Sequence, residues 1–173
     1  MAEPLRPKQE NPKDFLATDT LLADDELMLR DTVRRYVSDK ILPDVGEWFD
    51  AGEFPYKEVS KAVGDLGLLG MHLTGYGCAG SSAMMYGLAC MELEYGDSGL
   101  RSFVSVQGSL AMFPIWAYGS EEHKQEWLPA MAAGDAIGCF GLTEPDSGSD
   151  PSSMRTNARQ EPGGDWILNG TKM

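Results

Sequence analysis

One stretch divides the chain: Cys139-Phe140-Gly141-Leu142-Thr143-Glu144-Pro145-Asp146-Ser147-Gly148-Ser149-Asp150-Pro151. The pattern before it is helical, and the pattern after it is typical of short strands and turns. Pro145 restricts its own φ and favours an extended conformation for Glu144. Gly148 offers a position where φ can be positive and where a ligand can approach the backbone closely. Two interpretations are open on these residues alone: a β-turn between edge strands, or a loop that presents backbone and hydroxyl groups to a flat polar ligand.

Length and composition are typical of a globular chain. The 173 residues are 42% hydrophobic and 24% charged, which supplies a packed core. The formal net charge of −13 repels nucleic-acid phosphates and anionic membranes, so we expect neither as a partner. No apolar run is long enough to cross a bilayer, and the polar first fifteen residues lack the plan of a secretory signal. We therefore expect a cytoplasmic protein.

The cysteines and histidines do not form a pattern of metal ligands. Cys78, Cys90 and Cys139 are widely spaced and odd in number, so they indicate a reducing compartment and no disulfide framework. We expect His72 to pack among apolar neighbours and His123 to be exposed. The sequence predicts no metal site.

Apolar periodicity predicts five helices after a loosely held tail over residues 1–19. The third is apolar on nearly every side, which predicts a central position in a bundle. Its methionines favour core filling, with an acyl-chain pocket as the alternative. Pro114 is expected to kink the fourth. The predicted helices cover residues 24–43, 55–67, 81–95, 100–118 and 120–134.

Arg101 is the side chain that the helical pattern explains least. It lies in the first turn of a predicted helix, where a cation faces the positive end of the helix dipole. A guanidinium there calls for a carboxylate or phosphate. A salt bridge to a neighbouring acid and an anionic ligand are both open.

From Ala136 onward the pattern changes to strands. Ile137–Leu142, Met154–Gln160 and Trp166–Leu168 are predicted strands. Asn169-Gly170 is a hairpin turn signal, so the last three residues are expected to begin a return strand.

The end of the chain suggests that it is a fragment. Domains rarely end three residues into a hairpin strand, since the backbone groups of that strand would be unpaired. We expect a helical domain over residues 20–134 and a truncated β domain over residues 135–173.

Thr143-Glu144-Pro145, followed by Gly148-Ser149-Asp150, resembles the T-E-P-x-x-G-S-D signature of the flavin-dependent acyl-CoA dehydrogenases. The resemblance extends from about Leu22 to the last residue. Within the family it is nearest to the glutaryl-CoA dehydrogenases, over residues 75–80, 97–110 and 118–151. It implies an N-terminal helical bundle, the first strands of a middle β-barrel-like domain, and an absent C-terminal helical domain.

The resemblance also implies a flavin site and a substrate site. Arg101 and Ser102 would face the acyl end of the substrate, where a guanidinium can hold the free carboxylate of a dicarboxylic chain. A monocarboxylic chain would leave a buried guanidinium unpaired. Ser149 would contact the CoA portion. The residues implied to bind FAD are Phe140, Gly141, Leu142, Thr143, Glu144, Pro145, Asp146, Ser147, Gly148 and Ser149.

The implied reaction is oxidation and decarboxylation of glutaryl-CoA to crotonyl-CoA. A carboxylate base removes the α-proton while the β-hydrogen leaves as hydride to the flavin, and the product then loses carbon dioxide. Electrons pass to an electron-transfer flavoprotein, and the complete enzyme would be a homotetramer. The family's base is a glutamate of the C-terminal domain, so we expect no catalytic residue in this chain and no activity from it alone.

Three alternatives are open. In the first alternative, the substrate is another short-chain or dicarboxylic acyl-CoA that is not decarboxylated. In the second, the chain is a non-catalytic half that completes a site with a separate polypeptide. The third alternative is a helical interaction domain without a cofactor.

Overall fold

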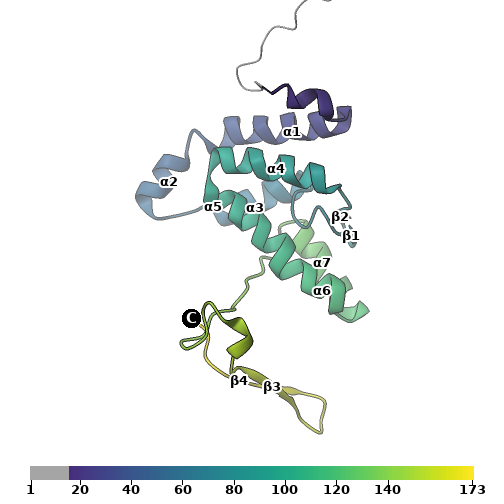
Figure 1. Ribbon diagram of the computed structural model, residues 1–173, viewed down its shortest axis with the longest axis vertical. Helices are drawn as coiled ribbons and strands as arrows, with labels where there is room; N and C mark the ends of the chain where they lie inside the picture. Colours follow the sequence, from purple (N-terminus) through teal and green to yellow (C-terminus); the bar gives the residue numbers. More distant parts are fainter. Residues whose placement is uncertain (1–15) are drawn as a thin grey trace, which may run out of the picture. The chain divides into compact units, whose positions relative to one another are not determined.

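The computed structural model describes residues 16–173, and the predicted tail over residues 1–19 lies mostly outside the described residues. The chain divides into two compact units (Figure 1). The first unit ends at Ile137, and the second unit comprises Gly138–Met173. Each unit is described separately.

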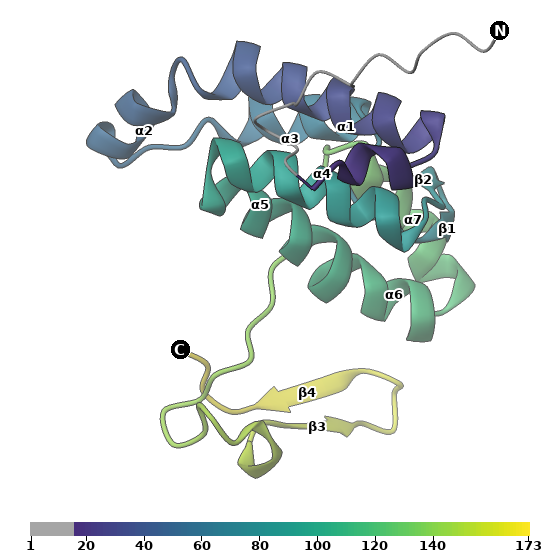
Figure 2. The ribbon, with the colours of Figure 1, turned by 45° about the horizontal axis from the view of Figure 1, so that its top comes forward.

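The first unit is a bundle of helices in which α1 packs along α4, and α4 along α5 (Figure 2). A two-stranded pair, β1 (Thr74–Gly75) and β2 (Cys78–Ala79), lies between α3 and α4 in the sequence. The helices are α1 (Asp24–Tyr36), α2 (Val45–Ala51), α3 (Tyr56–Asp65), α4 (Ala83–Gly96), α5 (Ser98–Ser105), α6 (Phe113–Tyr118) and α7 (Glu121–Ala132). Two π-helical segments, Val37–Ile41 and Val106–Met112, continue α1 and join α5 to α6, and a 3-10 turn covers Thr18–Leu21.

Side-chain caps fix three of the helix starts. The Ser82 hydroxyl accepts a hydrogen bond from the Met85 amide at the start of α4, and Ser120 does the same at the start of α7. The Asp97 carboxylate caps α5 through the Leu100 amide. Each cap satisfies an amide that has no partner within its helix, which typically stabilises a helix by about 1 kcal/mol.

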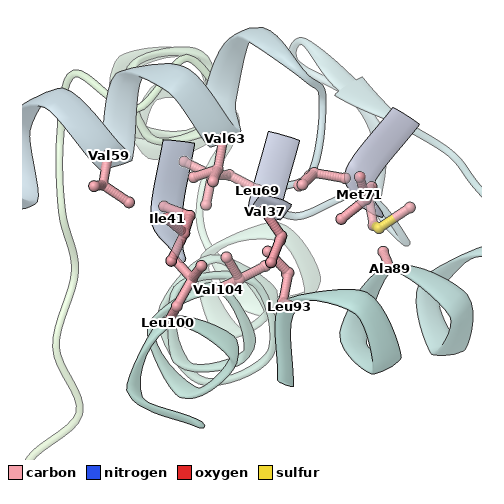
Figure 3. Close-up of a cluster of buried hydrophobic side chains, with 12 residues drawn as sticks. Val37, Ile41, Val59, Val63, Leu69, Met71, Ala89, Leu93, Leu100 and Val104 are labelled. Atoms are coloured by element: carbon pink, nitrogen blue, oxygen red, sulfur yellow. The ribbon is translucent and has the colours of Figure 1, made fainter. Parts of the chain in front are cut away.

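The core of the first unit lies where the end of α1, α3, α4 and α5 meet. Val37 and Ile41 point toward Leu93 and Leu100, with Val63 of α3 across from them (Figure 3). All five side chains are at most 1% exposed. Burying a side chain of this size contributes about 1.5–3 kcal/mol relative to leaving it exposed.

All five predicted helices form, but the prediction missed α2. This helix has only seven residues and lies between Pro43 and Pro55, too short for a periodic pattern to stand out. The predicted helix over residues 100–118 begins at Ser98 and consists of α5, the π-helical segment and α6. The irregular turns precede Pro114, which occupies the first turn of α6, where a missing amide is tolerated.

The predicted central position of the third helix is only partly right. Leu88 and Leu93 of α4 are buried, but Met84, Met91 and Tyr95 are 51%, 50% and 64% exposed. Among the described residues, α4 packs mainly against α1 and α5. The remaining side of its apolar surface is therefore uncovered.

The second unit contains one antiparallel hairpin of β3 (Asn157–Gln160) and β4 (Trp166–Asn169), preceded by a 3-10 turn at Pro151–Ser153. Asn157 pairs with Asn169, and Gln160 pairs with Trp166. The turn between the strands spans residues 161–165 and places Gly164 at a φ of 95°, a conformation that glycine adopts easily. Two predicted strands, around residues 154–160 and 166–168, are confirmed.

Two strand predictions were wrong. Residues 137–142 form no strand, because no segment of the described chain pairs with them along a ladder. Asn169-Gly170 does not turn the chain into a return strand, since β4 already pairs with β3. The chain runs on instead to residue 143, where the Met173 amide donates to the Thr143 carbonyl over 2.9 Å.

No helix in residues 16–173 is long and apolar enough to span a membrane. The same residues contain no group of three or more His, Cys, Asp or Glu side chains placed to hold a metal ion.

Candidate functional site

The stretch from residue 140 to residue 149, termed here the 140–149 loop, is built around one tight turn. Glu144 and Ser147 exchange two backbone hydrogen bonds of 3.1 Å each, which places Pro145 and Asp146 at the corner. The predicted extended residue followed by a proline turn is therefore present. Gly148 does not use the positive φ that glycine permits, but a Cβ placed on it would meet no atom of residues 16–173 within 4 Å. The space beside this backbone is open within the chain.

The Glu144 carboxylate faces inward and ties the loop to the residues before β3. It is 6% exposed and accepts hydrogen bonds from the Arg155 amide over 2.7 Å and from the Thr156 amide over 3.0 Å. The neighbouring Thr156 side chain, these amides and the Lys172 ammonium lower the pKa of Glu144 to about 2, against the opposing effect of burial. Thr156 Oγ1 itself is buried without a hydrogen bond of regular geometry.

Lys172 connects three parts of the second unit. Its ammonium donates to the Leu142 carbonyl over 2.9 Å and to the Glu144 carboxylate over 3.1 Å, and it lies 3.2 Å from the sulfur of Met154. Lys172 was not among the site residues predicted from the sequence. The one feature of the sequence that could have drawn attention to it is that no other lysine lies between Lys124 and Lys172.

The outer side of the loop presents apolar surface and unused donors. Phe140 and Leu142 are 47% and 38% exposed, and Thr143 is exposed. Among residues 16–173, no group accepts a hydrogen bond from the Leu142 or Thr143 amides. A flat apolar ring with hydrogen-bond acceptors along one edge, such as the isoalloxazine of FAD, fits this combination of groups.

Arg101, in the first unit, is paired with an acid from its own chain. Its Nε donates to Glu94 Oε2 over 2.7 Å, and the side chain is 36% exposed. The hydrogen bond to Glu94 raises the pKa of Arg101, and the bonds from Arg101 and Ser98 lower the pKa of Glu94. Of the two interpretations left open, the structure shows the salt bridge. The guanidinium is therefore not, within residues 16–173, the buried, unpaired cation that was expected in the absence of a ligand.

The pairing with Glu94 leaves part of the guanidinium unused. Among the described residues, neither Nη atom of Arg101 donates a hydrogen bond, and the Ser102 hydroxyl likewise has no described partner. Arg101 and Ser102 are consecutive residues near the middle of α5, so they offer two adjacent sets of donors. An exposed carboxylate is a suitable acceptor for such donors.

His72, in the same unit, lies in a small aromatic contact with Tyr86. The rings of His72 and Tyr86 meet edge to face at 5.3 Å, and the Tyr86 hydroxyl donates to Ser105 over 3.3 Å. Burial lowers the pKa of His72. His72 therefore packs against an aromatic ring, as predicted.

The first unit contains a cavity whose lining leaves these polar residues out. It has a volume of about 680 Å³ and includes neither Arg101 nor Ser102. Its walls are mostly apolar and include Trp48, Phe54, Leu100, Phe103 and Ile137. The predicted site residues thus fall into two groups: Arg101 and Ser102 in the first unit, and the 140–149 loop in the second.

Comparison with known proteins assigns the chain to a family. The family profile "Acyl-CoA dehydrogenase, N-terminal domain" matches residues 23–135, and "Acyl-CoA dehydrogenase, middle domain" matches residues 139–173. The chain belongs to the acyl-CoA dehydrogenase family.

Individual relatives include enzymes of two kinds. A crystal structure of glutaryl-CoA dehydrogenase from Mycobacterium smegmatis in complex with FADH2 is 61% identical with a TM-score of 0.90, covering 95% of this chain and 42% of that one. A glutaryl-coenzyme A dehydrogenase in complex with glutaryl-CoA is 33% identical with a TM-score of 0.81, covering 87% and 39%. The mitochondrial short-chain specific acyl-CoA dehydrogenase of Rattus norvegicus is 39% identical over 149 residues, covering 84% and 35%. The chain thus spans less than half the length of these relatives.

Proposed function

We propose that this chain is part of an FAD-dependent dehydrogenase that oxidises and decarboxylates glutaryl-CoA to crotonyl-CoA. The observation that carries the substrate proposal is that the Nη atoms of Arg101 and the adjacent Ser102 hydroxyl have no hydrogen-bond partner in residues 16–173. A planar guanidinium held at its Nε by Glu94 is oriented to bind a carboxylate with its other edge. The 61% identity to a glutaryl-CoA dehydrogenase supports the same substrate.

The cofactor proposal rests on the 140–149 loop. The exposed side chains of Phe140 and Leu142 provide apolar contact, and the Leu142 and Thr143 amides donate toward the acceptor edge of the ring. Bound FAD supplies hydride acceptance, and fixed amide dipoles stabilise the charge that reduction brings. Ser149 is exposed at the end of the loop and is proposed to contact the CoA portion.

Other parts of the proposal concern the complete enzyme. We place the helical domain at residues 20–134 and the start of the β domain at residues 135–173. The catalytic base is assigned to the part of the family's fold that these residues do not cover. Electrons leave to an electron-transfer flavoprotein, and the enzyme is a cytoplasmic homotetramer.

The test is an assay of the complete protein with glutaryl-CoA and an artificial electron acceptor. We expect release of crotonyl-CoA and carbon dioxide. Turnover of butyryl-CoA without carbon dioxide from glutaryl-CoA would contradict the substrate proposal and favour a short-chain dehydrogenase, which the 39% identity to the rat enzyme makes the second candidate. A purified protein without a flavin absorbance band would contradict the cofactor proposal.

The Arg101→Ala variant tests the role of the guanidinium. We expect kcat/KM for glutaryl-CoA to fall by about 10- to 100-fold, the loss of one or two charge-assisted hydrogen bonds, with FAD content unchanged. Arg159→Ala, which removes an exposed cation paired with Glu161, is the control and should keep the wild-type rate. Equal loss of rate and FAD in Arg101→Ala would indicate a folding role.

A further inference from the structure

We propose that Glu144 and Lys172 are positioning residues for the flavin. They fix the backbone at Leu142 and Thr143. The carbonyls of these two residues then bond within the chain, and their amides are left for the cofactor. This inference rests on the proposed function, because it requires that the 140–149 loop binds FAD. It assigns a role to Lys172, and it changes the role of Glu144 from a cofactor contact to a support of the contacting backbone.

The path of the Lys172 side chain is the first observation. A Cβ placed on Gly141 would lie 3.8 and 3.9 Å from Cγ and Cβ of Lys172, so the aliphatic part of the lysine passes beside the loop backbone. The ammonium then reaches the Leu142 carbonyl over 2.9 Å and the Glu144 carboxylate over 3.1 Å. A compact ammonium with three donors can serve both acceptors at once, which a planar guanidinium does less readily.

The second observation concerns the backbone groups that remain. The Leu142 carbonyl is used by Lys172, and the Thr143 carbonyl accepts from the Met173 amide over 2.9 Å. The amides of the same two residues have no partner among residues 16–173. The interactions with Lys172 and Met173 therefore leave donors, and no free carbonyl acceptors, at this position.

The third observation is that the Glu144 carboxylate is buried and already engaged by three donors of its own chain. It is 6% exposed, Oε2 accepts from the Arg155 amide, and Oε1 accepts from the Thr156 amide and Lys172. These bonds hold the turn at Pro145 against the residues before β3. Glu144 thus anchors the lysine, and the lysine anchors the Leu142 carbonyl.

The experiment compares FAD binding in the complete protein and in the Lys172→Met and Glu144→Gln variants. FAD is removed, and the apoprotein is titrated with FAD by flavin fluorescence. We expect Lys172→Met to raise the Kd for FAD about tenfold, the effect of about one charge-assisted hydrogen bond. Glu144→Gln keeps the shape of the side chain and one oxygen that can still accept from a backbone amide, so it should fold and weaken binding less, by about threefold. The double variant should bind FAD no more weakly than Lys172→Met, because both changes disrupt the same connected set of contacts among Glu144, Lys172 and the Leu142 carbonyl.

A second measurement separates positioning from stability. The midpoint potential of the bound flavin should become more negative in Lys172→Met, since displaced amides stabilise the reduced cofactor less. Arg159→Met, which removes a cation from the same hairpin, is the control and should leave both Kd and potential unchanged.

The outcomes are distinguishable. If the wild-type protein binds FAD, and both single variants match its Kd and potential, the positioning role is overturned while the proposed function stands. If the wild-type protein binds no FAD, the proposed function fails, and this inference fails with it. Folded variants with weaker FAD binding and a shifted potential support the inference.

Discussion

The two units of this chain keep their structure by different means. The first unit buries a cluster of aliphatic side chains, including Val37, Leu93 and Leu100, that come from several helical segments. In residues 138–173, the only buried residues are Glu144 and Ser147, and every residue of β3 and β4 is exposed. Apolar burial therefore stabilises the first unit, whereas the loop of the second depends on hydrogen bonds to one carboxylate.

The comparison is sharpest between two buried glutamates. Glu92 of α4, 3% exposed, receives both Nε and Nη2 of Arg34 over 2.9 and 2.6 Å and lies within a large apolar bundle. Glu144 receives two backbone amides and Lys172, in a unit where no hydrophobic residue of 138–173 is buried. The Arg34–Glu92 pair thus supplements an apolar core in the first unit. In the second unit, the contacts of Glu144 hold the loop without such a core.

The largest effect is expected from a change in the apolar core. Leu93→Ala should lower the free energy of unfolding by about 2–5 kcal/mol, because Leu93 is fully buried and its removal leaves a cavity. Chemical denaturation followed by circular dichroism measures this loss. Met91→Ala, on the exposed side of the same helix, should cost less than about 0.5 kcal/mol. Equal losses would show that the exposed side of α4 is also packed.

Removing the ion pair of the first unit should have a smaller effect. Arg34→Met should cost about 2 kcal/mol, below the usual cost of stranding a buried charge, because Arg34 is 42% exposed and Glu92 can gain partial hydration. Adding Glu92→Gln should recover part of the loss, since an amide is easier to bury than a carboxylate. A double variant less stable than Arg34→Met would contradict this explanation. Denaturation midpoints provide the measurement.

Acid should affect the second unit through Glu144. The pKa of this carboxyl is lowered to about 2 from 4.5, so the stability it contributes is present above pH 4.5 and is lost as pH falls from 4.5 toward 2. The Arg155 and Thr156 amide resonances should shift over this range. Glu144→Gln should remove the shift, and Glu161→Gln on the same hairpin should keep it. A midpoint at the ordinary value of a glutamate would contradict the inward-facing, paired carboxylate.

The smallest effect on stability is expected at Gly148. Gly148→Ala should change the free energy of unfolding by less than about 0.5 kcal/mol, because its φ is not positive and the added methyl meets no atom within 4 Å. FAD binding should nevertheless weaken about threefold, as the methyl occupies space that a ligand uses. Gly163→Ala, equally open but in the hairpin turn, should leave both quantities unchanged. If Gly148→Ala binds FAD as tightly as the wild type, the cofactor does not lie against the backbone at Gly148.

Sequence patterns were most informative where structure is local. The helices follow from apolar periodicity, and the caps at Ser82 and Ser120 mark two of the helix starts. The failures involve partners distant in sequence. Ile137–Leu142 has a strand-like composition, yet a strand requires a neighbour, and the described chain provides none along its length. Asn169-Gly170 has the composition of a hairpin turn, but β4 pairs with a strand that precedes it.

The candidate site shows the same division. The 140–149 loop could be found from sequence because its prolines, glycines and hydroxyls are consecutive, and because its motif resembles that of one family. Arg101 could be identified from the sequence as a cation that needs an acid. The identity of that acid, Glu94, depends on how the α4–α5 turn brings the two side chains together.

By itself, the sequence determined the helical bundle, the change to β structure after residue 136, and the family to which the chain belongs. All of these follow from the order and spacing of neighbouring residues. Only the tertiary structure decided that Glu144 faces inward and that Lys172, 28 positions later in the sequence, binds it. The same holds for the Leu142 and Thr143 amides, which have no partner among residues 16–173. Such contacts depend on the folded path of the backbone, which local spacing does not encode.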